Sequence, residues 1–118
     1  MPNPWSLVRM GGSGGLTKIQ APPRVIVMPA ELGAANADFF GERLGSAFVP
    51  GVTVVVADMT ETIHCDSWGV RMLVLAHKRA TANHAELRLA VPSAVLRHTF
   101  ALAGLLLPIY PTMRAALA

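Results

Sequence analysis

The sequence predicts one small α/β domain with a mixed β-sheet, made of an N-terminal antiparallel hairpin followed by parallel strands, and about four α-helices. Two observations predict this fold class. The 118 residues are 53% hydrophobic and only 14% charged, enough for one packed core and too few residues for two. Short β-branched runs also alternate with helical patterns, and strands separated by single helices imply right-handed parallel crossovers.

The N-terminal part of the chain predicts an extension and then the hairpin. Residues 1–15 are expected to form a flexible extension, because a cluster of four glycines and a serine is costly to order. The folded domain is then expected over residues 16–118. Strand patterns cover residues 16–20 and 24–28 and are separated by Pro22-Pro23, and so short a connection favours antiparallel pairing.

The middle of the chain predicts a helix followed by the most apolar strand. Glu31-Leu32-Gly33 leads into the helix, for which Asn36 is the expected N-cap, and Pro50-Gly51 ends it. Residues 52–57 are then apolar without interruption and mostly β-branched, a pattern typical of a strand covered on both faces. Asp58 follows the end of this strand.

The second half of the chain alternates helices and strands in the same way. A stripe of apolar residues predicts a helix from about Ser67 to Ala82, with Asn83-His84 as its stop. The remaining elements are a strand over 87–91, a helix opened by Pro92-Ser93 with Gly104 as its C′ residue, a short strand at Ile109-Tyr110, and a last helix capped by Thr112.

Composition limits the cellular setting. The only cysteine, Cys65, cannot form an internal disulfide, which fits a reducing compartment such as the cytoplasm. No apolar run reaches the roughly 20 residues that span a bilayer, and the N-terminus lacks a signal-peptide pattern, so no membrane association is expected. The net charge of +3 reflects either a basic face for an acidic partner or nucleotide, or scattered solvated charges. Without a basic cluster interleaved with aromatics, direct nucleic-acid binding is not expected.

Catalytic and metal-binding patterns are weak. His64, Cys65, Asp66 and Ser67 include every residue type of a hydrolase triad, but consecutive residues cannot converge on one reacting atom. The histidines lack the spacing of zinc ligands, and no glycine-rich phosphate-binding sequence occurs. We therefore expect neither an enzyme nor a cofactor.

Ser67 stands where a strand has ended and a helix begins, and it supports two interpretations. As an N-cap it would stabilise the helix by about 1 kcal/mol and do nothing else. As a phosphorylation site it would gain roughly −1.5 to −2 charges at a helix end that tolerates anions, next to Asp66, which would repel them. Trp68 follows, and is either an interface anchor or packed on the neighbouring loop.

These residues resemble a known family. The segment from Asp58 to Val70, D-M-T-E-T-I-H-C-D-S-W-G-V, is similar to the signature of STAS domains, in particular of bacterial anti-sigma factor antagonists. Glu31-Leu32 and Gly104-Leu105 match two further landmarks of that family. The likeness covers about residues 16 to 118.

The resemblance implies a binding module with a STAS-like mixed sheet. In such antagonists the serine that matches Ser67 is phosphorylated by an anti-sigma factor that is also a serine kinase. The unphosphorylated form captures that partner and frees the sigma factor, and a PP2C-type phosphatase resets the cycle. The expected partner-binding residues are Glu31, Asp58, Asp66, Ser67, Trp68 and Arg71.

The chain departs from the family pattern at three points. Trp68 replaces a small Ser or Thr, Gly33 replaces the Asp of a Glu-Leu-Asp motif, and the chain is basic where many relatives are acidic. Two alternatives therefore stay open: an unphosphorylated STAS scaffold or accessory subunit of a signalling or transporter complex, and a nucleotide-binding STAS sensor.

Overall fold

A central parallel sheet organises the protein. The computed structural model describes residues 21–103 and 107–118, together with the backbone of residues 8–9 and 16–17. The sheet has the strand order β3-β5-β7-β8, and every neighbouring pair in it is parallel. Its strands are β3 (Arg24–Val27), β5 (Val54–Asp58), β7 (Glu86–Ala90) and β8 (Ile109–Tyr110).

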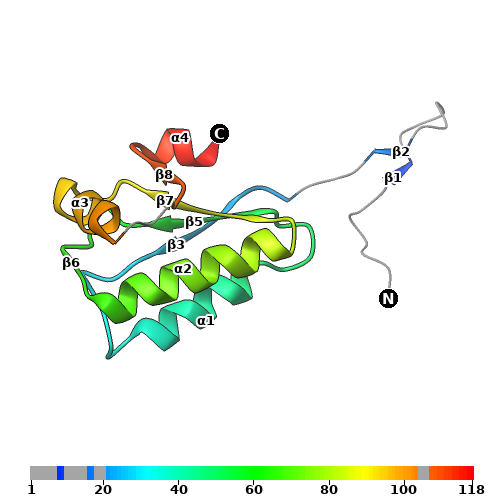
Figure 1. Ribbon diagram of the computed structural model, residues 1–118. Coiled ribbons are helices and arrows are strands. Elements are labelled where there is room, and N and C mark those ends of the chain that lie inside the picture. The colour runs from blue at the N-terminus through cyan, green and yellow to red at the C-terminus, as the bar shows by residue number, and fades with distance from the viewer. Residues whose placement is uncertain (1–7, 10–15, 18–20, 104–106) are drawn as a thin grey trace.

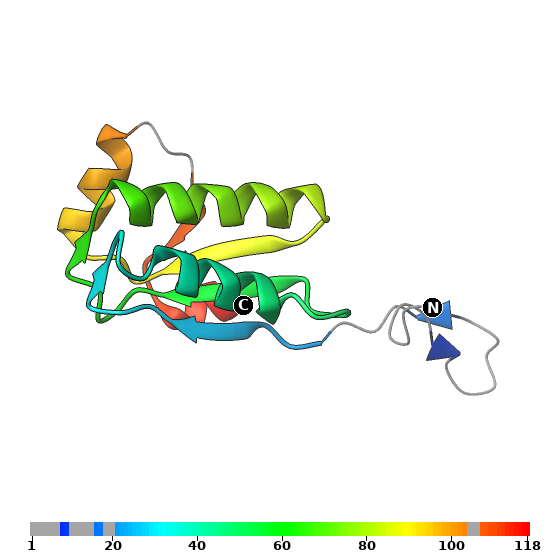
Figure 2. The same cartoon turned by 90° about the horizontal axis from the view of Figure 1, so that it is seen from below.

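Helices lie on both faces of this sheet (Figure 1). Helices α1 (Ala37–Ala47) and α2 (Ser67–Ala82) lie side by side across one face, as Figure 2 shows. Helix α4 (Met113–Leu117) lies on the opposite face, and α3 (Ala94–Leu102) lies near the carboxyl ends of the strands. No helix among the described residues is long and apolar enough to cross a membrane.

The core has one part on each face of the sheet, because successive side chains of a strand point to opposite sides. Val55 and Ala57 of β5 belong to the larger part, beneath α1 and α2, whereas Val56 belongs to the smaller part with Ala116 of α4. All three of these β5 side chains are fully buried. The prediction that this strand is covered on both faces is therefore confirmed, with the strand itself shifted to residues 54–58.

Most predicted helices and strands are found within a few residues of their predicted bounds. Helix α2 has the predicted ends, and β7 begins and ends one residue earlier than predicted. Thr112 caps α4 as predicted, since its hydroxyl accepts a hydrogen bond from Ala115 N at 3.0 Å. The predicted helix start at Pro92-Ser93 is also found, and there the Ser93 hydroxyl accepts a hydrogen bond from Leu96 N at 3.2 Å. The predicted role of Gly104 lies outside the described residues.

Asn36 holds the N-cap position of α1 but does not cap it with its side chain. Its Oδ1 accepts a hydrogen bond from Gly33 N at 3.0 Å, and its Nδ2 donates to the Glu31 carbonyl at 2.8 Å. The side chain is thus used to shape the preceding turn. The predicted side-chain cap is wrong for this reason.

The predicted antiparallel hairpin between residues 16–20 and 24–28 is not found. Leu16–Thr17 (β2) pairs antiparallel with Val8–Arg9 (β1), and β3 pairs in parallel with β5. Residues 18–20 lie outside the described part, as does most of the extension predicted over 1–15. Ala21 N donates to the Gly51 carbonyl at 3.0 Å, so the chain enters β3 beside the loop between α1 and β5.

The structure contains a second, two-stranded parallel sheet that was not predicted from the sequence. It pairs β4 (Glu31–Leu32) with β6 (His64–Cys65), in the register Glu31 to His64 and Leu32 to Cys65. Each strand has two residues, too few to produce a recognisable alternation of polar and apolar side chains. This small sheet places the segment before α1 beside the segment before α2.

Helix α2 ends in a Schellman motif. Ala85 N donates to the Ala80 carbonyl at 2.9 Å, and His84 N donates to the Thr81 carbonyl at 3.1 Å. His84 has a φ of 57°, in the left-handed region that favours glycine. The predicted stop at Asn83-His84 is confirmed.

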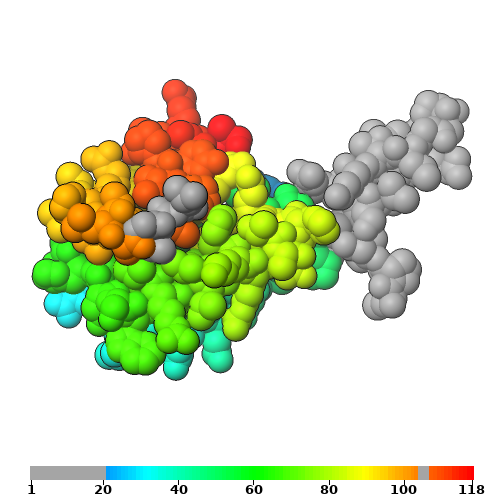
Figure 3. Space-filling model, in the orientation of Figure 1, coloured from blue at the N-terminus to red at the C-terminus, as the bar shows by residue number. Residues whose placement is uncertain are grey.

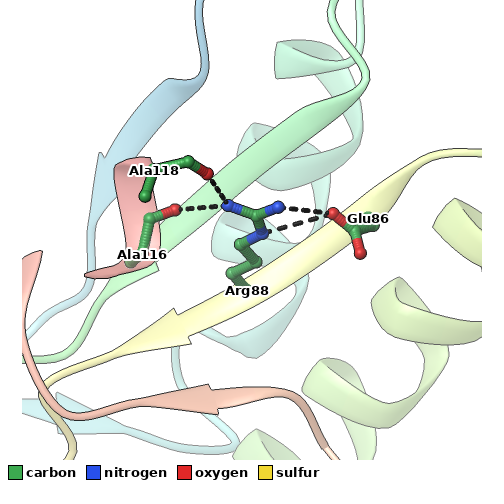
Figure 4. Close-up of polar contacts among 4 residues, drawn as sticks. All are labelled: Glu86, Arg88, Ala116 and Ala118. Atoms are coloured by element: carbon green, nitrogen blue, oxygen red, sulfur yellow. Dashed lines mark hydrogen bonds and ion pairs between the residues drawn. The ribbon is translucent and has the colours of Figure 1, made fainter. Parts of the chain in front are cut away.

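Arg88 holds α4 against the sheet, as Figure 4 shows. Its Nη1 donates to the main-chain oxygens of Ala116 and Ala118, both at 2.9 Å, and its Nη2 donates to Glu86 Oε2 at 2.8 Å. The guanidinium carbon also lies 5.1 Å from the centroid of the Tyr110 ring. The arginine side chain is only 14% exposed, so these contacts satisfy a charge that is largely shielded from water.

Candidate functional site

The candidate site lies at the carboxyl edge of the parallel sheet, where open α/β folds place their functional groups. Strand β5 ends here at Asp58, β6 follows, and α2 begins at Ser67. Ser67 is exposed, and its hydroxyl makes no hydrogen bond within the described part of the chain. Helix α2 forms a large part of the molecular surface on the side drawn in Figure 3.

Asp66, and not Ser67, caps α2. Its Oδ1 accepts hydrogen bonds from Trp68 N at 2.9 Å and Gly69 N at 3.1 Å. Asp66 has the extended backbone typical of an N-cap, whereas Ser67 is already the first helical residue. The interpretation of Ser67 as the cap is therefore wrong, and its hydroxyl is left free of that structural role.

The same carboxylate also reaches the loop that precedes α1. Asp66 Oδ2 accepts a hydrogen bond from Ala34 N at 3.3 Å, while Asp66 N donates to the Leu32 carbonyl at 3.1 Å. A Cβ atom added to Gly33 would lie only 2.8 Å from Asp66 Cγ. The glycine thus leaves the space that this carboxylate occupies.

These backbone donors stabilise the charged form of Asp66. The hydrogen bond from Gly69 N, helped by those from Ala34 N and Trp68 N, lowers the pKa of Asp66, and partial desolvation opposes the shift. The carboxylate is therefore ionised at neutral pH. Negative charge also suits this position because it lies at the positive end of the α2 dipole.

Close packing behind the site depends on Gly69. A Cβ atom there would lie 2.6 Å from the Leu32 carbonyl oxygen and 2.8 Å from Cys65 Sγ. Burial, and secondarily the charge of Asp66, raises the pKa of the Cys65 thiol to about 11. Because the thiolate is the nucleophile, Cys65 is a packed, unreactive thiol at neutral pH.

The structure brings four of the predicted partner-binding residues together and separates two. Asp66, Ser67, Trp68 and Arg71 all lie in or next to the first turns of α2, and each is exposed. Glu31 is exposed on β4, in register with His64, which is two residues before Asp66.

Asp58 is used within its own loop. Its Oδ1 accepts hydrogen bonds from Thr60 N at 3.0 Å and from the Thr60 hydroxyl. The side chain is half-buried and shapes the turn that leaves β5. Within the described residues, Asp58 makes no hydrogen bond with the Ser67 turn.

Two residues of the site were missed as participants, Gly33 and Ala34. Gly33 stood out in the sequence only as a departure from an acidic position. Comparison with the family motif did not reveal that the Asp66 carboxylate occupies the space that a side chain at position 33 would take. No group of three histidine, cysteine or acidic side chains among the described residues could hold a metal ion.

Comparisons with known proteins show the family and the fold. The family model described as STAS domain matches residues 16–116. No curated protein matches the chain.

Several solved structures share the fold. A candidate anti-sigma factor antagonist from Thermotoga maritima is 22% identical, with a TM-score of 0.68 over 78% of this chain and 83% of that one. The anti-sigma factor antagonist SpoIIAA in its unphosphorylated form is also 22% identical, with a TM-score of 0.66 over 80% of this chain and 84% of that one. The Bacillus cell fate determinant SpoIIAA in its phosphorylated form is 22% identical, with a TM-score of 0.61 over 80% of this chain and 87% of that one.

Proposed function

The chain belongs to the STAS domain family, and from this premise we propose that it is an anti-sigma factor antagonist switched by phosphorylation of Ser67. The domain that acts is residues 16–118, with residues 1–15 as an extension. The unphosphorylated form binds an anti-sigma factor that has serine kinase activity, and so regulates transcription without touching nucleic acid itself. A PP2C-type phosphatase restores this form. The cycle takes place in the cytoplasm of a bacterium, and the protein is a ligand and substrate rather than an enzyme.

The observation that carries this proposal is the exposed Ser67 hydroxyl. It stands at the first position of α2, and the capping hydrogen bonds are made by Asp66 instead. If the Ser67 hydroxyl capped the helix, phosphorylation would replace its capping hydrogen bond. Ser67 can be phosphorylated without breaking the contacts that hold this turn together.

Phosphorylation at this position would change the surface more than the fold. The Asp66 carboxylate already accepts the N–H groups of Trp68 and Gly69, so those donors are not free for a phosphate. The added charge of roughly −1.5 to −2 therefore faces outward, beside an existing negative charge. A partner surface that fits Asp66 and Ser67 would be repelled.

Arg71 is a second residue through which phosphorylation of Ser67 would weaken partner binding. It lies four positions after Ser67 on α2, a spacing that places two side chains on the same helical face. A phosphate on Ser67 can attract its guanidinium away from a partner carboxylate. Arg71 is thus proposed as a partner-binding residue in one state and a phosphate neighbour in the other.

The test is transfer of phosphate from ATP by the cognate kinase-type anti-sigma factor, located by mass spectrometry. We expect one phosphate, on Ser67, and none in the Ser67→Ala variant. Ser46→Ala is the matched control, because Ser46 is an exposed serine on α1 and its loss leaves labelling unchanged. Phosphate on another residue, or labelling that survives Ser67→Ala, would reject the proposal.

A scaffold without phosphorylation is the second candidate, and Trp68 favours it. This side chain is 57% exposed directly beside Ser67, as expected of an interface anchor. The scaffold hypothesis expects stable partner binding that Ser67→Asp leaves intact, whereas the switch hypothesis expects Ser67→Asp to abolish binding. The nucleotide-sensor hypothesis stays a prediction, and a lack of any thermal shift with GTP or ATP would count against it.

A further inference from the structure

A groove of about 1410 Å³ runs between α1 and α2 on the outer side of the helical layer. The two helices lie side by side along their length in Figure 2. The groove begins beside Trp68, at the start of α2, and continues to Asn83 at its end. These fifteen steps of helical rise correspond to about 22 Å.

Small residues line the groove on both sides. Gly41 and Gly45 line it on the α1 side, and Ala76 and Ala80 line it on the α2 side. A Cβ atom on Gly41 would lie 3.1 Å from Met72 Cγ, so the helices are in close contact there. At Gly45 an added Cβ atom would meet nothing within 4 Å, so space is open at this point.

The two walls of the groove carry opposite charges. Asp38 and Glu42 line it from α1, and Arg71 and Arg79 line it from α2. Among the described residues, the ion pair present is that of Arg88 with Glu86, and none crosses this groove. The acidic and basic walls are therefore both available to charges of an occupant.

Apolar side chains stand exposed along the same groove. Trp68 is 57% exposed, Leu75 42% and Val49 43%, and all three belong to its lining. Leu75 lies between Arg71 and Arg79 at spacings of four residues, so this wall alternates charge, apolar group and charge. Aromatic and aliphatic anchors flanked by charges are typical of a protein-binding groove.

We propose that this groove binds an amphipathic helix of a partner protein. The apolar face of the helix contacts the floor between α1 and α2, its basic edge faces Asp38 and Glu42, and its acidic edge faces Arg71 and Arg79. A helix of about four turns matches the length of the groove. This docking surface goes beyond the phosphorylation switch. It shares Trp68 and Arg71 with the surface around Ser67, and it is tested on the unphosphorylated protein.

The shape of the surface selects this occupant over a second copy of the chain. A helix is convex and fills a groove between two helices, burying its apolar stripe. Two copies meeting at this face would set one hollow against another and leave the small residues Gly45 and Ala76 without contacts. Such an interface would be poorly packed, and good packing is what specific interfaces need.

The test uses the full chain with Trp5→Phe, so that Trp68 is the single fluorescent reporter. The probe is a synthetic helical peptide of about 15 residues, with leucines on one face, lysines along one edge and glutamates along the other. Binding is expected to shift Trp68 emission to shorter wavelength and to saturate. Gly45→Leu, which fills the open space, is expected to weaken binding at least about tenfold, or 1.4 kcal/mol.

Gly45→Ala is the matched control, because one methyl group fills little of the groove. Its affinity for the peptide is expected to stay within about twofold of that of the parent protein. Arg79→Glu is expected to weaken binding of the same peptide, and a peptide with lysines on both edges is expected to bind Arg79→Glu better than the parent protein. Circular dichroism of each variant checks that the fold is kept.

Three results would overturn the proposal. The first is no saturable shift with the parent protein, and the second is binding that Gly45→Leu and Arg79→Glu leave unchanged. The third is a dimer, seen by analytical ultracentrifugation, that Gly45→Leu dissociates and the peptide does not, since it assigns the groove to a second copy. None of these results depends on phosphate transfer to Ser67, so they are separable from the test of the switch.

Discussion

The carboxylate of Asp66 occupies the space into which a side chain on Gly33 would project. A Cβ atom on residue 33 would lie 2.8 Å from Asp66 Cγ, and the carboxylate is held there by Ala34, Trp68 and Gly69. The position of the Asp66 carboxylate therefore requires a glycine at position 33, although 32 residues separate the two.

This arrangement predicts strong coupling between the two positions. Gly33→Ala is expected to lower the unfolding temperature, because Asp66 must give up its hydrogen bond to Ala34 to make room. In an Asp66→Ala background, Gly33→Ala is expected to lower the unfolding temperature only slightly. A double-mutant cycle by thermal unfolding measures the coupling, and equal effects of Gly33→Ala in both backgrounds would show that the two side chains do not compete.

Stability is predicted to depend on the ionisation of Asp66. Because its pKa is lowered in the folded state, the group stabilises the fold above its unfolded pKa of about 3.9. That contribution is lost as pH falls through the lower, folded-state pKa. At neutral pH we expect the parent protein to have a higher melting temperature than Asp66→Asn. This difference in melting temperature is expected to shrink as the pH falls below about 4. A difference that stays constant down to the lowest pH would exclude this role.

Arg88 is predicted to be essential for the docking of α4. Arg88→Met keeps an unbranched side chain but removes the donors to Ala116 and Ala118. It is expected to lower the free energy of unfolding, measured in urea, by about 1–3 kcal/mol. Glu86→Gln is the matched control, because Glu86 is 56% exposed and its ion pair is expected to contribute at most about 1 kcal/mol. Amide exchange in α4 should accelerate in Arg88→Met alone, and unchanged exchange would show that other contacts hold the helix.

His84 offers a stabilising substitution. Its φ of 57° is costly for a residue with a Cβ atom, and glycine adopts it freely. His84→Gly is expected to stabilise the protein by about 0.5–1 kcal/mol, and His84→Ala is expected to give no such gain because it keeps a Cβ atom. Thermal unfolding of the three proteins tests this, and a lower melting temperature for the glycine variant would contradict it.

Cys65 is predicted to react slowly with alkylating reagents at neutral pH. Its thiol has a pKa raised to about 11, so the thiolate fraction and the rate with iodoacetamide should keep rising well above pH 9. An exposed cysteine made by Ser46→Cys in a Cys65→Ala background is the control, and its rate should level off by about pH 10. A plateau for Cys65 at the control's pH would mean that the thiol is solvated.

The order of elements could be predicted because its signals are local. Helix α2 shows a stripe of apolar residues over sixteen positions, and β5 is a continuous β-branched run, so both were recognisable from sequence alone. The helix start at Pro92-Ser93 and the cap at Thr112 were also predicted, since each precedes its helix with no competing capping residue.

What was missed depends on contacts between distant residues or on very short segments. Asp66 and Ser67 are both good capping types, and only the backbone conformation decides that Asp66 caps and Ser67 is free. The β4–β6 pair has two residues a strand, and its partners are 33 residues apart. The pairing of β3 was wrong because a short connection favours a hairpin on average, and the actual partner, β5, lies across a helix.

The position of the Asp66 carboxylate also has a thermodynamic consequence. It binds the first turn of α2 with one oxygen and the loop before α1 with the other, so it belongs to two segments at once. Any charge placed on Ser67 acts on that carboxylate and therefore on its bond to Ala34. Linkage is reciprocal, so a protein that binds the Ala34 loop and changes this hydrogen bond would alter the free energy of modifying Ser67 by the amount that the modification alters its binding. Such a partner would sense the state of the serine without touching it.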